Sequence, residues 1–404
     1  MNEQTSAKPN VLCIASYEKG QAFLQQLAAD GCNVILLTAQ KLRDAGWPWE
    51  AILEIHTFSD IPTPEEVLRL VQHVARRMHV DRIVALDEFD LEAAALVREE
   101  LRLPGMGQTT TRHFRDKLAM RTRARQMGLR VPDFIGIHTH SDIAHFLRNT
   151  RGPWLLKPRT SASAIGIRTI REEHDLWRSL EELGDEQATF LLECFVPGSV
   201  FHVDSVSWNR EVLLQSAQRY GAPPMSLMQG GGVFTTRTLD RASVEAGALR
   251  EIDRELLMAL GMVSGVTHSE FIQADEDGSF YFLETAARVG GAFIAELVEF
   301  STGVNPWREW ARIEAAMALG QNYTLSPTVE SYAGSVICLS RQEWPDLSAF
   351  ADPEVVFRMP KRHHAGLIVQ SESAVRVEGL LQEYRERFAK DFLASLPPPD
   401  RPTS

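Results

Sequence analysis

The sequence predicts a chain of mixed α and β structure that opens with a small parallel sheet covered by helices. Two β-branched apolar runs, at 10–16 and 33–38, flank an amphipathic stretch, which is the pattern of strand, helix and strand. A helical stretch over 64–79 and an apolar run at 82–87 continue the alternation. Alternation of this kind places strands parallel in one sheet with helices on its faces.

A change of pattern marks the end of this first unit. The segment LPGMGQTTTRHF, at 103–114, interrupts the alternation with Pro and Gly and supplies threonines that can cap a following helix. We place a domain boundary there. The rest of the chain is richer in alternating strand-like segments, and it closes with predicted strands at 331–340 and 363–370 and a helix over 374–394.

Composition and charge narrow the classes of partner. The 404 residues are 44% hydrophobic and carry a formal net charge of -12, which indicates a soluble globular protein and repels nucleic acid and anionic lipid. The first ten residues lack a signal-peptide pattern, and no apolar run reaches the roughly 20 residues of a membrane span. We expect a cytoplasmic protein that binds neither nucleic acid nor membrane.

The first predicted turn argues against a nicotinamide or flavin site. SYEKGQ, at 16–21, has a single glycine, whereas the dinucleotide fingerprint GxGxxG needs three.

Two glutamates are predicted to face each other across a hairpin. Two strand-like runs flank EDG, and a three-residue loop with Gly278 in the left-handed position would pair Asp275 with Ser279. Glu270 then lies opposite Glu284, where like charges are unfavourable unless a cation lies between them. The alternatives are two solvated glutamates, or a register shifted by one residue that points them apart.

Arg288 follows Glu284 by four residues, among small residues and a pair of glycines that let a ligand approach closely. A metal beside a guanidinium suits a phosphate or carboxylate ligand. A buried Arg–Glu ion pair explains these residues almost as well.

Two lysines add to this pattern. Lys157 ends a strand-like run and precedes a loop of small and hydroxyl residues that can fold over phosphates. The loop is not a Walker A loop, because the lysine precedes the small residues. Lys117 lies in the early turns of a helix with several arginines, for which a solvated basic face is the alternative. The run at 190–197 is a strand that ends in a hinge-like VPG.

In their order, these segments resemble the ATP-grasp superfamily of carboxylate–amine ligases over about residues 109–315. They are FRDKLAMR, LLKP with its loop, LLECFVPG, HSEF and FLETAARVGG. The resemblance implies a Rossmann-like domain over 1–108 and an ATP-grasp domain of two α+β subdomains over 109–320, the smaller a lid over about 125–197. A C-terminal subdomain over 321–404 would follow, with a disordered tail from about 396.

The resemblance also implies roles for individual residues. Lys117 and Lys157 would contact the phosphates of ATP, and Glu270 and Glu284 would hold Mg²⁺ or Mn²⁺. Arg288 would steady an acyl phosphate, which makes Arg288 and Lys157 the catalytic candidates. The full set of implied nucleotide contacts is Lys117, Lys157, Ser161, Ser163, Gly166, Glu193, Cys194, Phe195, Val196 and Asp204.

The chain departs from the family pattern at two positions. Ala286 stands where an asparagine usually follows the second metal glutamate, which removes one oxygen ligand. Val200 stands where a carboxylate commonly holds the ribose, and Asp204 is the nearby substitute.

The function that follows from the resemblance is ATP-dependent joining of a small-molecule carboxylate to an amine, on amino acids or related metabolites. Asp87 or Glu88, at the end of a predicted strand, could orient the amine, although a helix N-cap with acidic first-turn residues is the commoner explanation of these acids. The alternatives are a silent ATP-binding regulator and a ligase that loads a carrier protein. A homodimer is the family-level expectation.

Overall fold

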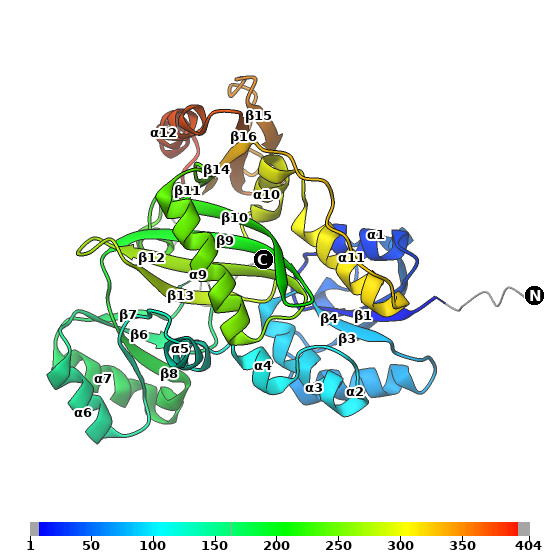
Figure 1. Ribbon diagram of the computed structural model, residues 1–404, viewed down its shortest axis with the longest axis horizontal. Coiled ribbons are helices and arrows are strands. Elements are labelled where there is room, and N and C mark those ends of the chain that lie inside the picture. Colours follow the sequence, from blue (N-terminus) through cyan, green and yellow to red (C-terminus); the bar gives the residue numbers. More distant parts are fainter. Residues whose placement is uncertain (1–7, 163, 395–404) are drawn as a thin grey trace, which may run out of the picture.

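The computed structural model describes residues 8–162 and 164–394, which form three sheets. In Figure 1 a four-stranded N-terminal sheet lies at the right, a small four-stranded sheet at the lower left, and an eight-stranded sheet above and between them. The disordered tail predicted from about 396 lies outside the described residues.

The N-terminal sheet is parallel, as predicted. Its order is β3-β2-β1-β4, with β1 (Asn10–Ala15) paired to both β2 (Asn33–Ala39) and β4 (Arg82–Ala85). The edge strand β3 (Ile52–Phe58) was not predicted, because its residues are mostly half-exposed and its apolar pattern is weak. The helices of this part are α1 (Gln21–Ala29), α2 (Pro64–Ala75), α3 (Leu91–Leu101) and α4 (Gln108–Arg112).

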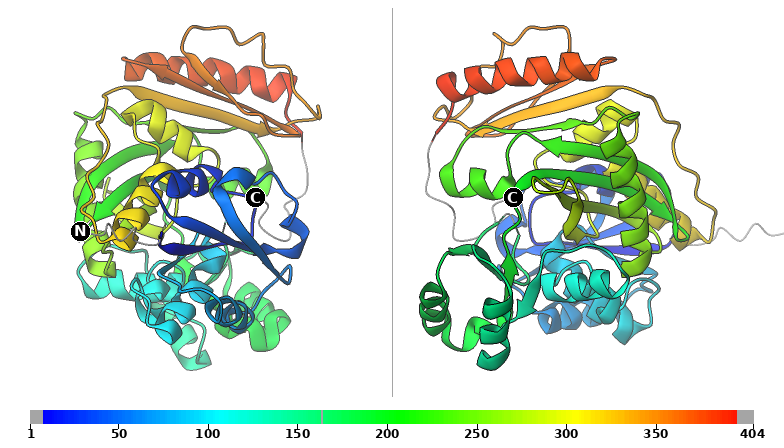
Figure 2. Two further views of the ribbon diagram at one scale, coloured as in Figure 1. Left: turned by 90° about the vertical axis from the view of Figure 1, so that its right-hand side faces the viewer. Right: turned by 60° about the vertical axis from the view of Figure 1, so that its left-hand side comes forward.

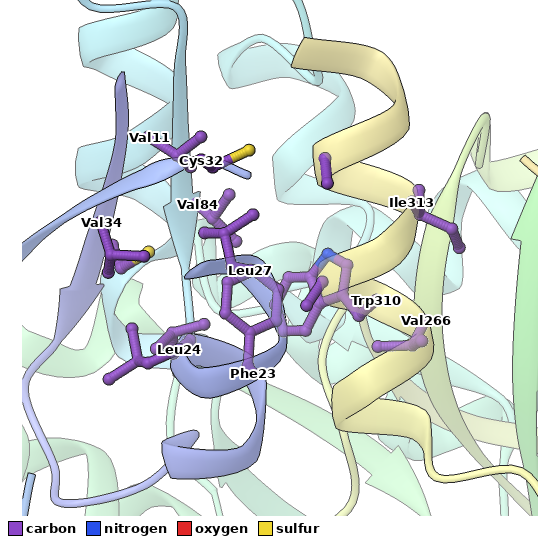
Figure 3. Close-up of a cluster of buried hydrophobic side chains, with 14 of the residues drawn as sticks. Val11, Phe23, Leu24, Leu27, Cys32, Val34, Val84, Val266, Trp310 and Ile313 are labelled. Atoms are coloured by element: carbon purple, nitrogen blue, oxygen red, sulfur yellow. The ribbon is translucent and has the colours of Figure 1, made fainter. Parts of the chain in front are cut away.

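The two faces of β1 bury different partners because its side chains alternate. Leu12 and Ile14 pack with residues of α2 and α3. Val11 and its neighbours on the other face pack with α1 and with α11 (Pro306–Leu319), a helix from the far end of the chain. Figure 3 shows the rings of Phe23 on α1 and Trp310 on α11 meeting in this core, 5.2 Å between centroids. The N-terminal sheet is thereby fixed to the rest of the molecule.

The small sheet is antiparallel and carries two helices. Its order is β5-β8-β6-β7. The strands are β5 (Phe134–Gly136), β6 (Trp154–Pro158), β7 (Arg168–Ile170) and β8 (Phe190–Cys194), and the helices are α6 (His140–Asn149) and α7 (Glu173–Leu183). The helix α5 (Lys117–Gln126) precedes the sheet in the chain.

The large sheet has the order β13-β12-β9-β10-β11-β14-β16-β15, and its neighbouring strands are antiparallel. Its strands are β9 (Gly198–Trp208), β10 (Glu211–Tyr220), β11 (Phe234–Thr238), β12 (Gly265–Ala274), β13 (Phe280–Ala286), β14 (Tyr332–Leu339), β15 (Val355–Arg358) and β16 (His364–Ser371). The C-terminal strands extend this sheet, since β14 pairs with β11. The predicted domain limits stay a prediction.

Helices cover the large sheet on both sides. They are α8 (Pro224–Gly230), α9 (Val244–Leu260), α10 (Ile294–Thr302), α11 and α12 (Ala374–Asp391). In Figure 1, α9 crosses in front of β9 and β12, and Figure 2 shows α12 lying along the C-terminal strands. Within residues 8–162 and 164–394, none of the helices combines the length and apolar composition needed to cross a membrane.

Candidate active site

The hairpin of β12 and β13 places two carboxylates side by side. Glu270 on β12 lies directly opposite Glu284 on β13, so the two side chains share one face of the sheet. The predicted pairing is confirmed, and the alternative register that points the two glutamates apart is wrong.

The turn of this hairpin differs from the predicted one. The backbone N–H of Ala274 donates to the carbonyl of Ser279 at 2.9 Å, so the loop comprises residues 275–278 and Asp275 does not pair with Ser279. Gly278 has the expected positive φ of 70°. A loop one residue longer than predicted would, by itself, shift every later pair.

A β-bulge cancels this shift. Phe271 lies opposite Phe282, whereas the preceding residue Glu270 lies opposite Glu284, so Leu283 is the extra residue. The bulge allows two residues of β13 that are two positions apart to point to opposite faces of the sheet. Phe282 is buried in the core, whereas Glu284 faces the other side. In a regular strand, residues two apart share a face.

Lys117 begins α5 and contacts Glu284. The Asp116 side chain accepts a hydrogen bond from the backbone N–H of Leu118 at 3.0 Å and caps the helix. Nζ of Lys117 lies 2.8 Å from Oε2 of Glu284 and donates to the carbonyl of Ser161 at 2.6 Å. A solvated basic face is therefore wrong for this lysine.

The Lys117 contact fixes the charge of Glu284. Burial alone would raise the pKa of the Glu284 carboxyl, but Lys117 and, to a smaller extent, Lys157 lower it to about 2. This carboxylate is therefore ionised at neutral pH.

Lys157 belongs to a more deeply buried cluster. Its Nζ lies 2.6 Å from one oxygen of Glu193, and Arg121 Nη1 lies 2.7 Å from the other. Burial opposes the charge on Glu193, but Arg121 and Lys157 together hold the pKa of the carboxyl below its usual value. Arg121 was missed in the sequence, although it follows Lys117 by four residues and therefore shares its helix face.

Arg288 contacts the N-terminal sheet. Its Nη2 lies 2.7 Å from Oε1 of Glu88, and its Nη1 donates to the carbonyl of Val289 at 2.7 Å. Glu88 lies in the turn after β4, so this ion pair joins residues 200 positions apart in the chain. The neighbouring Asp87 is a local cap, as the alternative for these acids predicted, because it accepts from the backbone N–H of Phe89 at 2.9 Å.

A second buried network lies beneath Glu270. Asp204 accepts from His202 Nδ1 at 2.8 Å and from His268 Nδ1 at 2.9 Å. Tyr220 donates its hydroxyl to Glu270 at 2.8 Å and lies 3.4 Å from His268 Nε2. His268 belongs to the HSEF segment, but no pattern in the sequence indicated a role for it or for Tyr220.

Charge stabilises this network. Burial alone would lower the pKa of His268, but Asp204 raises it to about 10. Burial likewise opposes ionisation of Asp204, whereas His268 and His202 lower its pKa to about 2. An imidazolium therefore stands beside Glu270 at neutral pH, with His268 Nε2 3.7 Å from Glu270 Oε1.

Comparison with known proteins identifies the fold that carries these residues. No family model matches the chain. The L-arginine-specific L-amino acid ligase of Bacillus subtilis is 23% identical over 297 residues, which are 69% of this chain and 70% of that ligase. The alanine–anticapsin ligase of the same organism is 31% identical over 123 residues, only 30% of this chain and 26% of that ligase.

Solved structures match over nearly the whole chain. An L-amino acid ligase from Bacillus licheniformis superposes with a TM-score of 0.73 at 20% identity, covering 95% of this chain and 98% of that one. The N5-carboxyaminoimidazole synthetase of Staphylococcus aureus, in complex with ADP, gives a TM-score of 0.71 at 15% identity, with coverage of 93% and 96%. The chain has the ATP-grasp fold. The resemblance inferred from the ordered segments is confirmed.

The ATP-grasp fold brings the predicted metal ligands together in a form that fits a hard divalent cation. Glu270 and Glu284 lie side by side, and the pKa of Glu284 is lowered to about 2, so this carboxylate is ionised at neutral pH. Carboxylate oxygens are the ligands that Mg²⁺ prefers. Ala286, which stands where the family pattern has an asparagine, lies opposite His268 in the hairpin. An imidazole is therefore next to the position where the asparagine oxygen is lacking. The metal assignment itself stays a prediction.

The histidine network is a second group of possible metal ligands among the described residues. Ligand atoms of His202, Asp204 and His268 lie within 4.8 Å of one another. However, hydrogen bonds to the two histidines already occupy both carboxylate oxygens of Asp204. The Asp204 side chain is 5% exposed, and its predicted ribose contact stays a prediction.

The predicted phosphate loop and hinge lie beside this ATP-grasp site. The loop provides the Ser161 carbonyl to Lys117, and Gly166 has a φ of 76°; Ser163 lies outside the described residues. In the hinge, Phe195 is bonded through its N–H to the Pro153 carbonyl at 3.0 Å, and its side chain is partly exposed. The remaining hinge residues are Cys194, whose N–H donates to the Asp133 carbonyl at 2.7 Å, and Val196, which packs against a small apolar cluster.

Proposed function

We propose that this protein is an ATP-dependent carboxylate–amine ligase that acts on amino acids or related metabolites. The observation that carries the proposal is the convergence of Lys117, Glu284 and Glu270 on one face of the large sheet, with Arg288 following on the same strand segment. The named activities of the L-amino acid ligases and of the alanine–anticapsin ligase support the substrate class.

In the proposed reaction, a substrate carboxylate oxygen attacks the γ-phosphorus of ATP, the bond from that phosphorus to the β-phosphate oxygen breaks, and ADP leaves. The amine nitrogen of the second substrate then attacks the acyl carbon, phosphate leaves, and the amine loses a proton. Catalysis of this kind rests on positioning and charge neutralisation. A bound magnesium ion would neutralise phosphate charge.

We assign the residues of the chain as follows. Lys117 and Lys157 would bind phosphate oxygens, with Lys157 held in place by Glu193. Glu270 and Glu284 would hold the metal, and Arg288 would bind the activated carboxyl group. The loop over 160–166 would close on the phosphates, and the hinge at 193–196 would contact adenine, with the small sheet acting as the lid. A cytoplasmic location and a homodimer stay predictions.

The test is release of ADP and phosphate from Mg-ATP in the presence of pooled amino acids and small carboxylates. Glu284→Gln serves as the blank, because it removes the metal-facing charge at nearly constant volume, and we expect turnover to fall at least about 10²-fold. Release that requires both an acid and an amine supports the ligase. Tight ATP binding by calorimetry without release, across the whole pool, would favour the silent regulator or the loading of a carrier protein.

A further inference from the structure

We infer that Arg115 binds an oxyanion of a ligand, a phosphate or a carboxylate group, at the border between the N-terminal sheet and α5. The inference rests on the proposed function, because the oxyanion would belong to a ligand of the same site. Binding and stability measurements can test it without any turnover of the enzyme.

Arg115 is a buried arginine whose charge has no partner in the described part of the chain. The residue is 7% exposed, and its Nε has no hydrogen-bond partner among the described residues. Within residues 8–162 and 164–394, no ion pair joins its guanidinium to a carboxylate. A buried charge without a counter-ion is costly, and a buried polar group without a protein partner points to a bound ion, ligand or water.

The other buried arginines of the described chain all have acceptors. Arg121 lies 2.7 Å from Glu193, Arg82 is also held by a glutamate, and Arg98 donates to backbone carbonyls. Arg115 is equally buried but lacks such an acceptor. This difference indicates that the acceptor of Arg115 comes from a bound ligand.

The carboxylate next to Arg115 in the chain is already engaged. Asp116 accepts from Nε of Arg159 at 3.0 Å and from the backbone N–H of Leu118 at 3.0 Å. The other oxygen of Asp116 pairs with Nη2 of Arg159. Asp116 therefore neutralises Arg159 and leaves the charge of Arg115 without compensation.

The guanidinium of Arg115 lies where two ligand sites of the proposed reaction meet. Its Cζ is 4.6 Å from the centroid of the Phe89 ring, and Phe89 follows Glu88, the partner of Arg288. On the other side, Arg115 precedes Lys117 by two residues, and we assign Lys117 to the phosphates. In Figure 1 the link from α4 to α5 runs between the N-terminal sheet and the small sheet.

Stacking on Phe89 leaves the edge of the guanidinium for an oxyanion. The ring covers a face of the guanidinium, whereas the N–H groups point outward in its plane. A carboxylate or a phosphate can accept two such N–H groups at once, which a lysine does not offer in a fixed geometry. Two groups of the proposed site fit this description, a phosphate of the nucleotide near Lys117 and a second carboxylate on an acid substrate held at Arg288.

The first experiment measures stability and anion binding in the full chain. Arg115→Met keeps the length of the side chain but removes its charge, and Arg115→Lys keeps the charge but not the planar fork. Arg112→Met, at an exposed arginine three residues earlier, is the control. Thermal midpoints are compared in sodium chloride and in sodium phosphate of equal ionic strength, and calorimetry measures the Kd of inorganic phosphate.

We expect Arg115→Met to melt in chloride at no lower temperature than the wild type, because it removes a buried charge that has no partner. Its Kd for inorganic phosphate should rise about 10- to 100-fold, which is the range for a lost hydrogen bond to a charged group. Arg115→Lys should lie between the wild type and Arg115→Met, and Arg112→Met should match the wild type.

Two results of this experiment overturn the inference. One is a thermal midpoint of Arg115→Met in chloride that lies well below that of the wild type, because the stack on Phe89 is then structural. The other is a Kd for inorganic phosphate that is the same in Arg115→Met and in the wild type.

A second experiment identifies the group that carries the oxyanion. Calorimetry compares Mg-ATP, L-aspartate and L-asparagine as ligands of the wild type and of Arg115→Met. A Kd for Mg-ATP that rises about tenfold or more assigns a nucleotide phosphate to Arg115. A loss of affinity for aspartate, with asparagine unchanged, assigns a substrate carboxylate.

If none of these three affinities changes, inorganic phosphate is an adventitious ion only, and the inference is overturned. A protein that binds these ligands through Arg115 but releases no ADP with any acid and amine contradicts the proposed ligase reaction and leaves the anion site in place.

Discussion

The ion pairs of this site are of two kinds, which differ in how far solvent reaches them. The Glu193 side chain is 2% exposed and lies between Arg121, at 1%, and Lys157, at 10%. The Glu284 side chain is 34% exposed opposite Lys117, at 12%. The carboxylate of the enclosed cluster, Glu193, cannot exchange partners without leaving a buried charge unpaired, whereas the more exposed carboxylate, Glu284, can accept a ligand.

The difference teaches that burial, rather than residue type, separates the glutamate that holds neighbouring cations in place from the glutamate to which we assign a metal. Glu193 and Glu284 are both glutamates paired to lysines, and burial opposes the charge on each while nearby cations lower its pKa. Glu193 fixes Lys157 in place. Glu284 stays charged and reachable.

Removing the enclosed arginine should have the largest effect. Arg121→Met leaves one oxygen of Glu193 without its cation, and we expect the free energy of unfolding to fall by about 3–5 kcal/mol, measured by urea denaturation. Arg125→Met is the control in the same helix, since Arg125 pairs with Asp133 at the surface, and should cost less than about 1 kcal/mol. If Arg121→Met and Arg125→Met lose the same free energy of unfolding, burial does not distinguish these two ion pairs.

A third kind of buried acid has no ion pair to a cation among the described residues. Asp253, in α9, accepts from Ser205 at 2.7 Å and from Gln215 at 2.9 Å, both at Oδ2, and Oδ1 has no hydrogen-bond partner among the described residues. Burial raises the pKa of this carboxyl to about 6. The unfolded chain, with a pKa near 4, loses its proton first as pH rises, so native stability falls between about pH 4 and pH 6.

Asp253→Asn should therefore stabilise the protein at neutral pH. The amide oxygen can accept both hydrogen bonds at the Oδ2 position without a charge, and we expect a gain of up to about 3 kcal/mol at pH 7 that disappears towards pH 4. Urea denaturation at a series of pH values provides the measurement, with the exposed Glu251→Gln in the same helix as control. A pH-independent difference would show that the charge is not its source.

On the open side, Arg288→Lys should keep a positive charge but lose the planar fork that holds a carboxylate or phosphate. We expect kcat/KM for the ligase reaction to fall about 10- to 100-fold, at an unchanged thermal midpoint. Arg130→Lys is the control, since Arg130 lies between α5 and β5 and its exposed side chain pairs with Asp277 at the tip of the β12–β13 hairpin. If Arg288→Lys keeps the full kcat/KM, Arg288 has a structural role and does not bind the substrate.

The smallest effect concerns the glycines that follow Arg288. A Cβ on Gly290 would lie 2.9 Å from Nδ1 of His268 and 3.1 Å from Oδ1 of Asp204, whereas a Cβ on Gly291 would meet nothing within 4 Å. We expect Gly290→Ala to lower turnover about tenfold by displacing Glu270 through His268. Gly291→Ala should be close to the wild type. If Gly290→Ala and Gly291→Ala have equal turnover, the histidine network does not position Glu270.

The sequence predicted much of this site because local patterns carry it. The facing of Glu270 and Glu284 follows from a hairpin, and the parallel N-terminal sheet follows from the alternation of apolar runs. The cluster of Arg121, Glu193 and Lys157 was not predicted, because it depends on which face of α5 packs against the core. Arg121 is buried and Arg125 is exposed, and a helix rich in arginine does not indicate which of them enters the core.

The contact of Glu88 with Arg288 could not be derived from the sequence either, because it depends on how the two sheets dock. That arrangement rests on the packing of α11 against α1, where Trp310 and Phe23 meet. In the short acidic segment after β4, Asp87 caps the turn, as one of the two alternatives predicted, whereas Glu88 pairs with Arg288. A contact of Glu88 with the amine substrate stays a prediction.

The bulge at Leu283 divides the β12–β13 hairpin into two segments with separate registers. The pairs from His268–Ala286 to Glu270–Glu284 follow one register, and the pairs from Phe271–Phe282 to the tip follow another. We therefore expect changes in the composition of the tip to leave the two carboxylates in place. The hairpin tip is accordingly a permissive position for inserting a label or tag in an otherwise intact enzyme.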